Sequence, residues 1–181
     1  HAINNQINDE WLIRDQGAIV RQLGWEPKAY AADLINREGG ADSCVKPFSP
    51  EIDVKGPYGG RGNDNRVGAD YAEMLTRIMN ADLAAIPGSY DEACHLELPG
   101  GITAHGHDAA DRFWIGLRAS FPNAAFTIEH QIGREDEGHA PRAAIRWGLH
   151  GKHDGWGSFG APTGADLYVM GVSHAEFGPR G

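Results

Sequence analysis

Residues 107–133, HDAADRFWIGLRASFPNAAFTIEHQIG, decide the fold class. Apolar residues first recur at helical spacing, and Pro122 then stops the pattern. After Pro122 the apolar spacing changes to two, which is typical of a strand with one buried face. The stretch therefore predicts a helix over 107–119 and a strand over 124–133. The residues on the apolar helical stripe are Ala110, Phe113, Trp114 and Leu117.

Two further strands are predicted downstream, over 141–151 and 166–177. They are separated from their neighbours by the charged turn REDEGH and by the glycine-rich loop GWGSFGAPTG. Upstream, 69–86 has the spacing of an amphipathic helix or helix pair. Helices followed by long strands in a meander indicate an α+β fold with a curved antiparallel sheet. We expect the helix over 107–119 to pack on the concave side of that sheet.

The N-terminal part has a different pattern. Residues 9–16 alternate between two faces, and from Gly17 to Gly24 the spacing becomes helical. This predicts a strand that runs into a short helix. Residues 25–67 hold many turn formers and are interpreted as a linker or arm, with a further short helix allowed over 25–37.

Composition excludes several classes of protein. The net charge of −9 argues against a nucleic-acid binder, which needs a basic surface to neutralise phosphates. A mean hydropathy of −0.44 and the lack of a long apolar run argue against a membrane span. The two cysteines stand in no metal-type spacing, and no secretory leader pattern opens the chain, so we expect a cytoplasmic protein.

Nine histidines are present, and their phase matters more than their number. On the last predicted strand, His174 alternates in phase with Met170 and Val172, and His130 is in phase with Phe126 on the first. An imidazole on an apolar face either has a buried partner or faces a cavity, and the buried partner is the commoner case.

Asp15 raises the same question, because it shares a predicted strand face with Trp11 and Ile13. A buried carboxyl without a partner has a raised pKa and costs stability. A structural role and a functional role are therefore equally open for Asp15.

Metal and nucleotide sites are not expected. His105 and His107 flank Gly106 in a predicted loop and lack a carboxylate at diagnostic spacing. The run GGRGN over 59–63 does not fit a phosphate-binding loop, and the sequence contains no nucleophile elbow.

A family resemblance emerges from four short motifs in order. They are Phe121-Pro122, Arg146-Trp147, Gly148-Leu149-His150 and Ala161-Pro162-Thr163-Gly164. In order and spacing they resemble the SnoaL-like polyketide cyclases of the nuclear-transport-factor-2-like superfamily, over roughly residues 68–181. The resemblance implies a cone made of a curved antiparallel sheet wrapped by helices.

The chain departs from the family at one end. The family's last strand and helix would follow Gly181, whereas DEWLIRDQGAIVRQLG at 9–24 looks like that missing element. Residues 1–24 are thus expected to be the terminal strand and helix of a SnoaL-like unit, and 68–181 a domain lacking its own last strand. Either the chain is the middle of a tandem protein, or residues 9–24 complete this sheet in cis or in a swapped dimer.

The resemblance also implies a chemistry. By motif, Asp15 and His174 take the positions of a general acid/base pair that closes a polyketide ester by aldol chemistry without metal or cofactor. The alternative is a non-catalytic ligand-binding or dimerisation module, since fold does not fix function. We expect a homodimer, no nucleic acid or membrane partner, and a small hydrophobic ligand. The expected binding residues are Trp114, Phe126, His130, Met170 and Val172.

Overall fold

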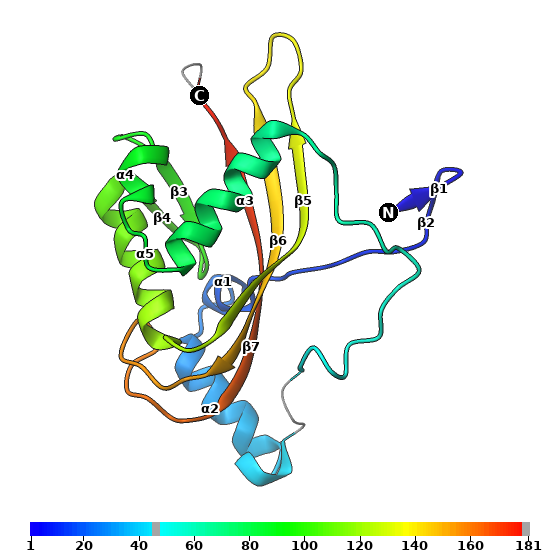
Figure 1. Ribbon diagram of the computed structural model, residues 1–181. Coiled ribbons are helices and arrows are strands. Elements are labelled where there is room, and N and C mark those ends of the chain that lie inside the picture. The colour runs from blue at the N-terminus through cyan, green and yellow to red at the C-terminus, as the bar shows by residue number, and fades with distance from the viewer. Residues whose placement is uncertain (45–47, 179–181) are drawn as a thin grey trace.

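The three predicted long strands form one antiparallel sheet. A computed structural model describes residues 1–44 and 48–178 of the chain (Figure 1). In it β5 (Ala125–Arg134), β6 (Arg142–Lys152) and β7 (Asp166–Glu176) pair in the order β5-β6-β7. The predicted α+β fold with a curved sheet is confirmed.

Helices cover one face of this sheet (Figure 1). They are α3 (Arg66–Met79), the short α4 (Ala85–Ser89) and α5 (His107–Ser120), and the hairpin of β3 (His95–Leu98) and β4 (Ile102–His105) lies beside them. Helix α3 begins at Asn65, whose side chain accepts a hydrogen bond from the Val67 amide at 3.0 Å.

The core lies between these helices and the sheet. Leu75 and Ile78 of α3 and Ile145 of β6 are fully buried. Trp114 and Leu117 of α5 are buried in the same cluster, which confirms the predicted apolar stripe. Each such side chain contributes about 1.5–3 kcal/mol by leaving water.

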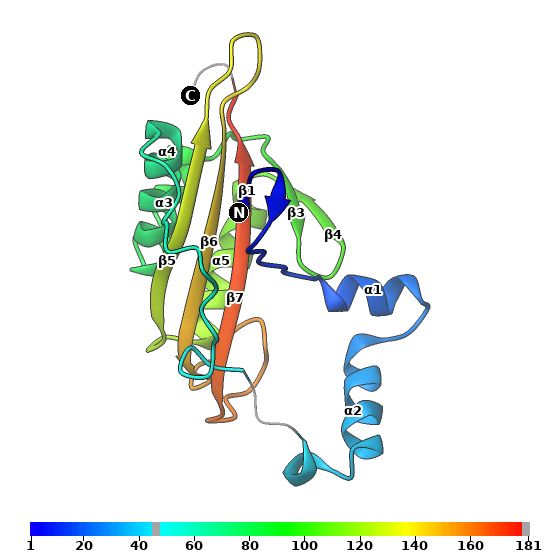
Figure 2. The ribbon, with the colours of Figure 1, turned by 90° about the vertical axis from the view of Figure 1, so that its right-hand side faces the viewer.

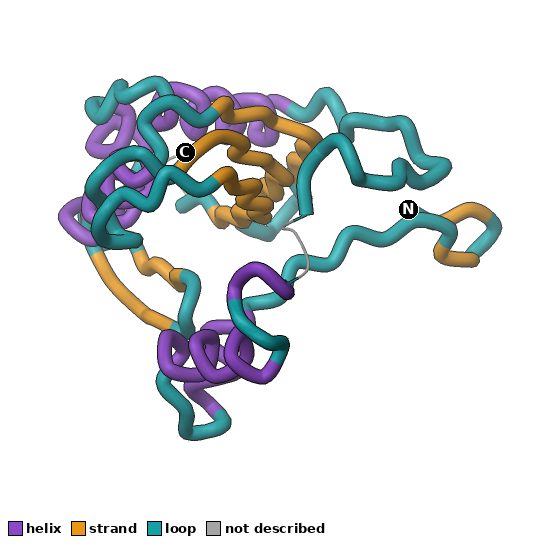
Figure 3. Tube along the Cα trace, turned by 90° about the horizontal axis from the view of Figure 1, so that it is seen from below, coloured by secondary structure: helices purple, strands orange, loops and turns teal. Residues whose placement is uncertain are grey.

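Residues 1–44 form an arm that packs little against this core. It holds β1 (Ala2–Ile3), β2 (Gln6–Ile7), α1 (Gln16–Gln22), α2 (Pro27–Arg37) and the 3₁₀ turn η1 (Ala41–Ser43). Figures 2 and 3 show α1 and α2 projecting from the body, and no residue of α2 is buried.

The strand predicted over 9–16 is wrong. Residues 8–15 have no regular structure, and in the described part of the chain β7 pairs only with β6. The physical reason lies at Asp15, whose side chain accepts a hydrogen bond from the Ala18 amide at 2.8 Å and so begins helix α1. Asp15 is also bound by the amides of Gly100 and Gly101 in the β3–β4 turn, and residues 10–13 form no backbone hydrogen bond to another described segment, so no ladder forms within one chain.

A bulge in β5 reverses the facing of its second half. The pairing register shifts between Ile128 and His130, so Ile128 is opposite Trp147 while His130 is opposite Arg146. Residue 129 is the extra residue of the bulge, which flips all later side chains to the other face. The expectation that His130 is in phase with Phe126 is therefore wrong.

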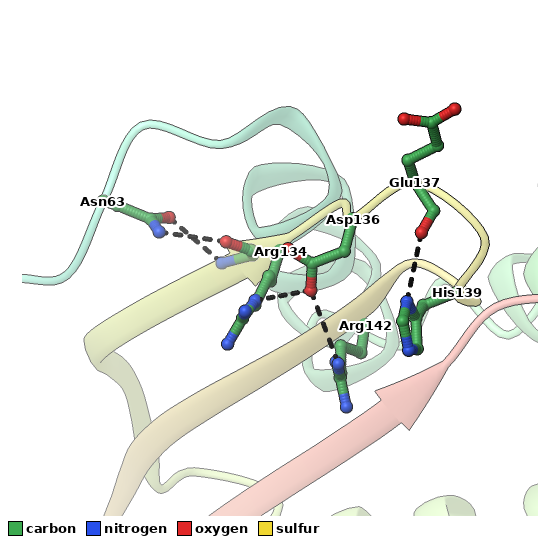
Figure 4. Close-up of polar contacts among 7 residues, drawn as sticks. Asn63, Arg134, Asp136, Glu137, His139 and Arg142 are labelled. Atoms are coloured by element: carbon green, nitrogen blue, oxygen red, sulfur yellow. Dashed lines mark hydrogen bonds and ion pairs between the residues drawn. The ribbon is translucent and has the colours of Figure 1, made fainter.

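The outer edge of β5 is covered by residues 61–63. Gly62 bridges Gln131, whose backbone bonds to both Arg61 and Asn63. The Asn63 amide then donates to the Gly133 carbonyl at 2.9 Å and accepts from its N–H at 3.0 Å (Figure 4). This side chain satisfies the groups that a neighbouring strand would satisfy.

Ion pairs between the side chains of Asp136, Arg134 and Arg142 hold the β5–β6 turn together (Figure 4). Asp136 lies 2.6 Å from Arg134 and 3.5 Å from Arg142, and hydrogen bonding to these guanidinium groups lowers the pKa of the Asp136 carboxyl.

No helix in the described ranges is long and apolar enough to cross a membrane.

Candidate functional site

The sheet separates the predicted binding residues into two groups. Trp114 and Phe126 belong to the cluster between the sheet and the helices. Met170 and Val172 are 43% and 52% exposed on the opposite face. With the bulge in β5, His130 joins that opposite face, so these residues do not line the one cavity that we expected.

Asp15 lies at the β3–β4 turn. Its carboxylate accepts hydrogen bonds from the amides of Gly100 at 2.6 Å and Gly101 at 3.3 Å, besides that of Ala18. These amide bonds, led by that of Ala18, hold the pKa of the Asp15 carboxyl below its usual value despite some desolvation. The raised pKa expected for a general base is therefore wrong.

His174 lies on β7, on the face of the sheet opposite the helices, which we call the open face. It is opposite Ala144 in the β6–β7 pairing, and its side chain is exposed. None of the hydrogen bonds of Asp15 involves His174, so the structure does not join the two as a pair.

The helix-side interior holds a cluster of hydroxyl and indole groups that sequence reasoning missed. The Trp114 Nε1–H donates to the Tyr90 hydroxyl at 2.9 Å. Across the cone, the Trp147 Nε1–H donates to the Ser173 hydroxyl at 3.0 Å, and Ser173 also hydrogen-bonds Tyr71. The interior polar cluster therefore consists of Tyr71, Tyr90, Trp114, Trp147 and Ser173.

Burial controls the protonation of both tyrosines in this cluster. Desolvation raises the pKa of Tyr71 and of Tyr90, and in Tyr90 the Trp114 hydrogen bond opposes the effect only in part. Both phenols are thus neutral at pH 7 and able to donate a proton in a hydrogen bond. The Tyr90 oxygen accepts from Trp114, which leaves its own O–H as the available donor.

A close approach positions Trp147. A Cβ on Gly171 would lie 2.1 Å from the indole, so only glycine lets the ring cross β7 to reach Ser173. Tyr71 lies in the stretch 69–86, whose spacing predicts an amphipathic helix or helix pair. The signal that could have singled it out is that a buried phenol needs a partner.

The open face carries a second polar group centred on Glu129. Its carboxylate lies 3.0 Å from Arg146 and accepts a hydrogen bond from the Tyr168 hydroxyl at 2.8 Å. Desolvation, then the bond to Glu129, raise the pKa of Tyr168 to about 12.

His130 lies beside this group under two aromatic rings. The Tyr58 hydroxyl is 3.2 Å from its Nε2, and the Trp11 ring, 5.3 Å away, is stacked under the Arg146 guanidinium at 4.0 Å. Burial and the nearby Arg146 lower the pKa of His130, so the imidazole is neutral at pH 7.

Two open grooves lie elsewhere. One of about 550 Å³ runs along α2, and one of about 330 Å³ lies between 61–64 and β5. Among the described residues there is no group of three or more histidine, cysteine or acidic side chains placed to hold a metal ion.

The domain has counterparts in known proteins. The sequence profile of the SnoaL-like domain matches residues 69–181. The chain belongs to the SnoaL-like domain family. No curated protein sequence matches it significantly.

One solved structure with a TM-score of 0.50 agrees with the fold of this SnoaL-like domain. A putative SnoaL-like polyketide cyclase from Jannaschia sp. CCS1 is 15% identical with a TM-score of 0.50, over 65% of this chain and 83% of that one. A putative hydroxylase, AclR from Streptomyces galilaeus, is 20% identical with a TM-score of 0.49, over 61% of this chain and 66% of that one. At these identities the likeness concerns the fold and does not assign a reaction.

Proposed function

We propose that this SnoaL-like domain binds a small hydrophobic carbonyl compound inside the cone. The observation that carries the proposal is the pair of neutral tyrosine hydroxyls set among apolar side chains, those of the buried Tyr71 and the half-buried Tyr90. A ketone or ester oxygen is an acceptor that such hydroxyls recognise.

The surroundings favour such a ligand on physical grounds. A hydrogen bond is stronger in a low-dielectric interior than in water, and the aromatic faces of Trp114 and Phe126 offer apolar surface. The rings of Trp114 and Trp147 lie 6.5 Å apart, so the ligand enters by displacing side chains of this cluster.

Acid/base chemistry of the polyketide-cyclase type is the second candidate, favoured by the family. In it a base removes a proton next to the carbonyl, and a tyrosine hydroxyl stabilises the enolate oxygen. The expected base, Asp15, has a lowered pKa and is held by three amides, and His174 faces the other side of the sheet. Binding is therefore the better-supported function, and the Asp15–His174 pair stays a prediction.

One probe tests both candidates. 2-Acetylnaphthalene is an aromatic ketone with exchangeable protons next to its carbonyl, and its binding is followed by quenching of tryptophan fluorescence. We expect saturable quenching, and a three- to tenfold weaker affinity in Tyr90→Phe, the loss of one hydrogen bond of about 1 kcal/mol.

The matched control is Tyr58→Phe, which removes a hydroxyl from the open face and should leave the affinity unchanged. Equal affinities of the wild type and Tyr90→Phe would contradict the proposal. Proton exchange of the acetyl group in D₂O, followed by NMR, tests catalysis. Exchange that His174→Ala abolishes would support the acid/base pair, whereas binding without exchange would support the binding module.

A further inference from the structure

We propose that residues 9–14 of one chain add as a strand to the free edge of β7 in a second copy, so that two chains exchange strands. The surface is the edge of β7 that faces away from β6, and the partner is a second copy of this chain. The proposal does not depend on the ligand proposed above.

The edge of β7 is open along its whole length. Of the described residues, none outside β6 pairs with this eleven-residue strand, whereas the opposite edge of the sheet is covered by residues 61–63. A long unpaired edge presents a row of free amides and carbonyls, which proteins normally cover. The edge of β5 is blocked around Gln131 and Gly133, whereas the edge of β7 has no paired strand in the described chain.

The same chain carries a segment with the properties of the missing strand. Trp11, Leu12 and Ile13 are 37%, 60% and 38% exposed, and residues 8–15 are outside any helix or strand. In the described chain, the backbone groups of residues 10–13 bond to no other backbone group. A segment with free backbone groups and exposed apolar side chains is what strand addition uses.

One antiparallel register matches side chains on both faces. With Arg14 of one chain opposite Asp166 of the other, Ile13 falls opposite Leu167 and Trp11 opposite Val169. Leu167 and Val169 are half-buried against the core, so Trp11 and Ile13 would extend it. On the open face, this register places Arg14 beside the carboxylate of Asp166, which pairs with Lys152 of its own chain at 2.6 Å.

The contacts in the arm favour a second copy over the same chain. The register needs residue 15 next to Ala165 at the start of β7, whereas Asp15 is held at the β3–β4 turn of its own chain by Gly100 and Gly101. Adding the segment in trans keeps this anchor. What is given up is the half-exposed packing of Trp11 against Arg146, Tyr58 and His130, together with the hydrogen bond from the Tyr58 amide to the Asp9 carboxylate at 3.1 Å.

Cross-chain disulfides test the register. In a background with Cys44 and Cys94 replaced by serine, a chain with Glu10→Cys is mixed with a size-tagged chain with Met170→Cys, and the mixture is oxidised. The register places these two residues opposite each other, so we expect a disulfide between the chains. The matched control, Trp11→Cys with Met170→Cys, puts the thiols on opposite faces and should not link.

Sedimentation of the full chain gives an independent measurement. We expect a dimer for the wild type, and a monomer with an unchanged circular dichroism spectrum for Ile13→Pro, since proline cannot donate to the new ladder. A monomeric wild type, a disulfide formed only within one chain carrying both cysteines, or equal linking of the control pair would each overturn the proposal.

Discussion

Replacing Asn63 by alanine should weaken the fold through two hydrogen bonds at the edge of β5. The amide of Asn63 donates to the Gly133 carbonyl and accepts from the Gly133 N–H, at 2.9 and 3.0 Å. Gly133 is buried, so water cannot take over either contact in full.

The size of the effect follows from these two contacts. Each hydrogen bond contributes about 1 kcal/mol net, and leaving a buried backbone group without a partner adds to the loss. We therefore expect the free energy of unfolding of Asn63→Ala to fall by about 2–3 kcal/mol. With a urea slope of roughly 2 kcal/mol per molar, the midpoint should fall by about 1 M.

The assay is urea unfolding followed by circular dichroism. The control is Asn123→Ala, since the Asn123 amide makes one exposed hydrogen bond to Asp154 at 2.8 Å. That variant should stay within about 0.5 kcal/mol of the wild type. If both variants unfold at the same urea concentration, the Asn63 side chain does not act as a substitute strand and the reasoning is refuted.

Three further predictions concern the interior, the open face and the arm. Gly171→Ala should cost about 1–3 kcal/mol in thermal unfolding, because the added Cβ displaces the Trp147 indole, and full stability in this variant would contradict that account. The pKa of His130 is lowered on folding, so its contribution to stability is complete above about pH 6.5 and is lost as the pH falls and the unfolded chain takes up the proton. His130→Gln should therefore lose less stability than the wild type between about pH 7 and 5. Asp15→Ala should raise amide hydrogen exchange in α1 and leave exchange in β6 unchanged, because it removes a cap from an arm outside the core.

The long periodic elements could be predicted from the sequence, and the local departures from them could not. The strands and the helix over 107–119 follow from hydrophobic spacing that persists for ten residues or more. The bulge at residue 129 leaves no clear mark on that spacing, although it moves His130 to the other face. The alternation over 9–16 is short, and it does not reveal that Asp15 caps α1 and binds the β3–β4 turn of its own chain.

The site was predicted in part for the same reason. Trp114 follows from the helix stripe, but its partner Tyr90 lies 24 residues earlier, just after a short helix, where no periodic pattern extends. Contacts between residues so far apart depend on how the elements pack, which spacing along one element does not encode. The sequence therefore predicted apolar residues of the interior, but it did not predict the hydroxyl groups that can donate hydrogen bonds to a ligand.

The covering of β5 by residues 61–63 has a consequence for polymerisation. Stacking sheets side by side into a fibre requires two free edges on every molecule, one to receive and one to give. With Asn63 and Gly62 bonded to Gln131 and Gly133, this part of the β5 edge cannot accept a further strand. The same few residues that complete the edge of β5 therefore also oppose the side-by-side addition of a second sheet at this place.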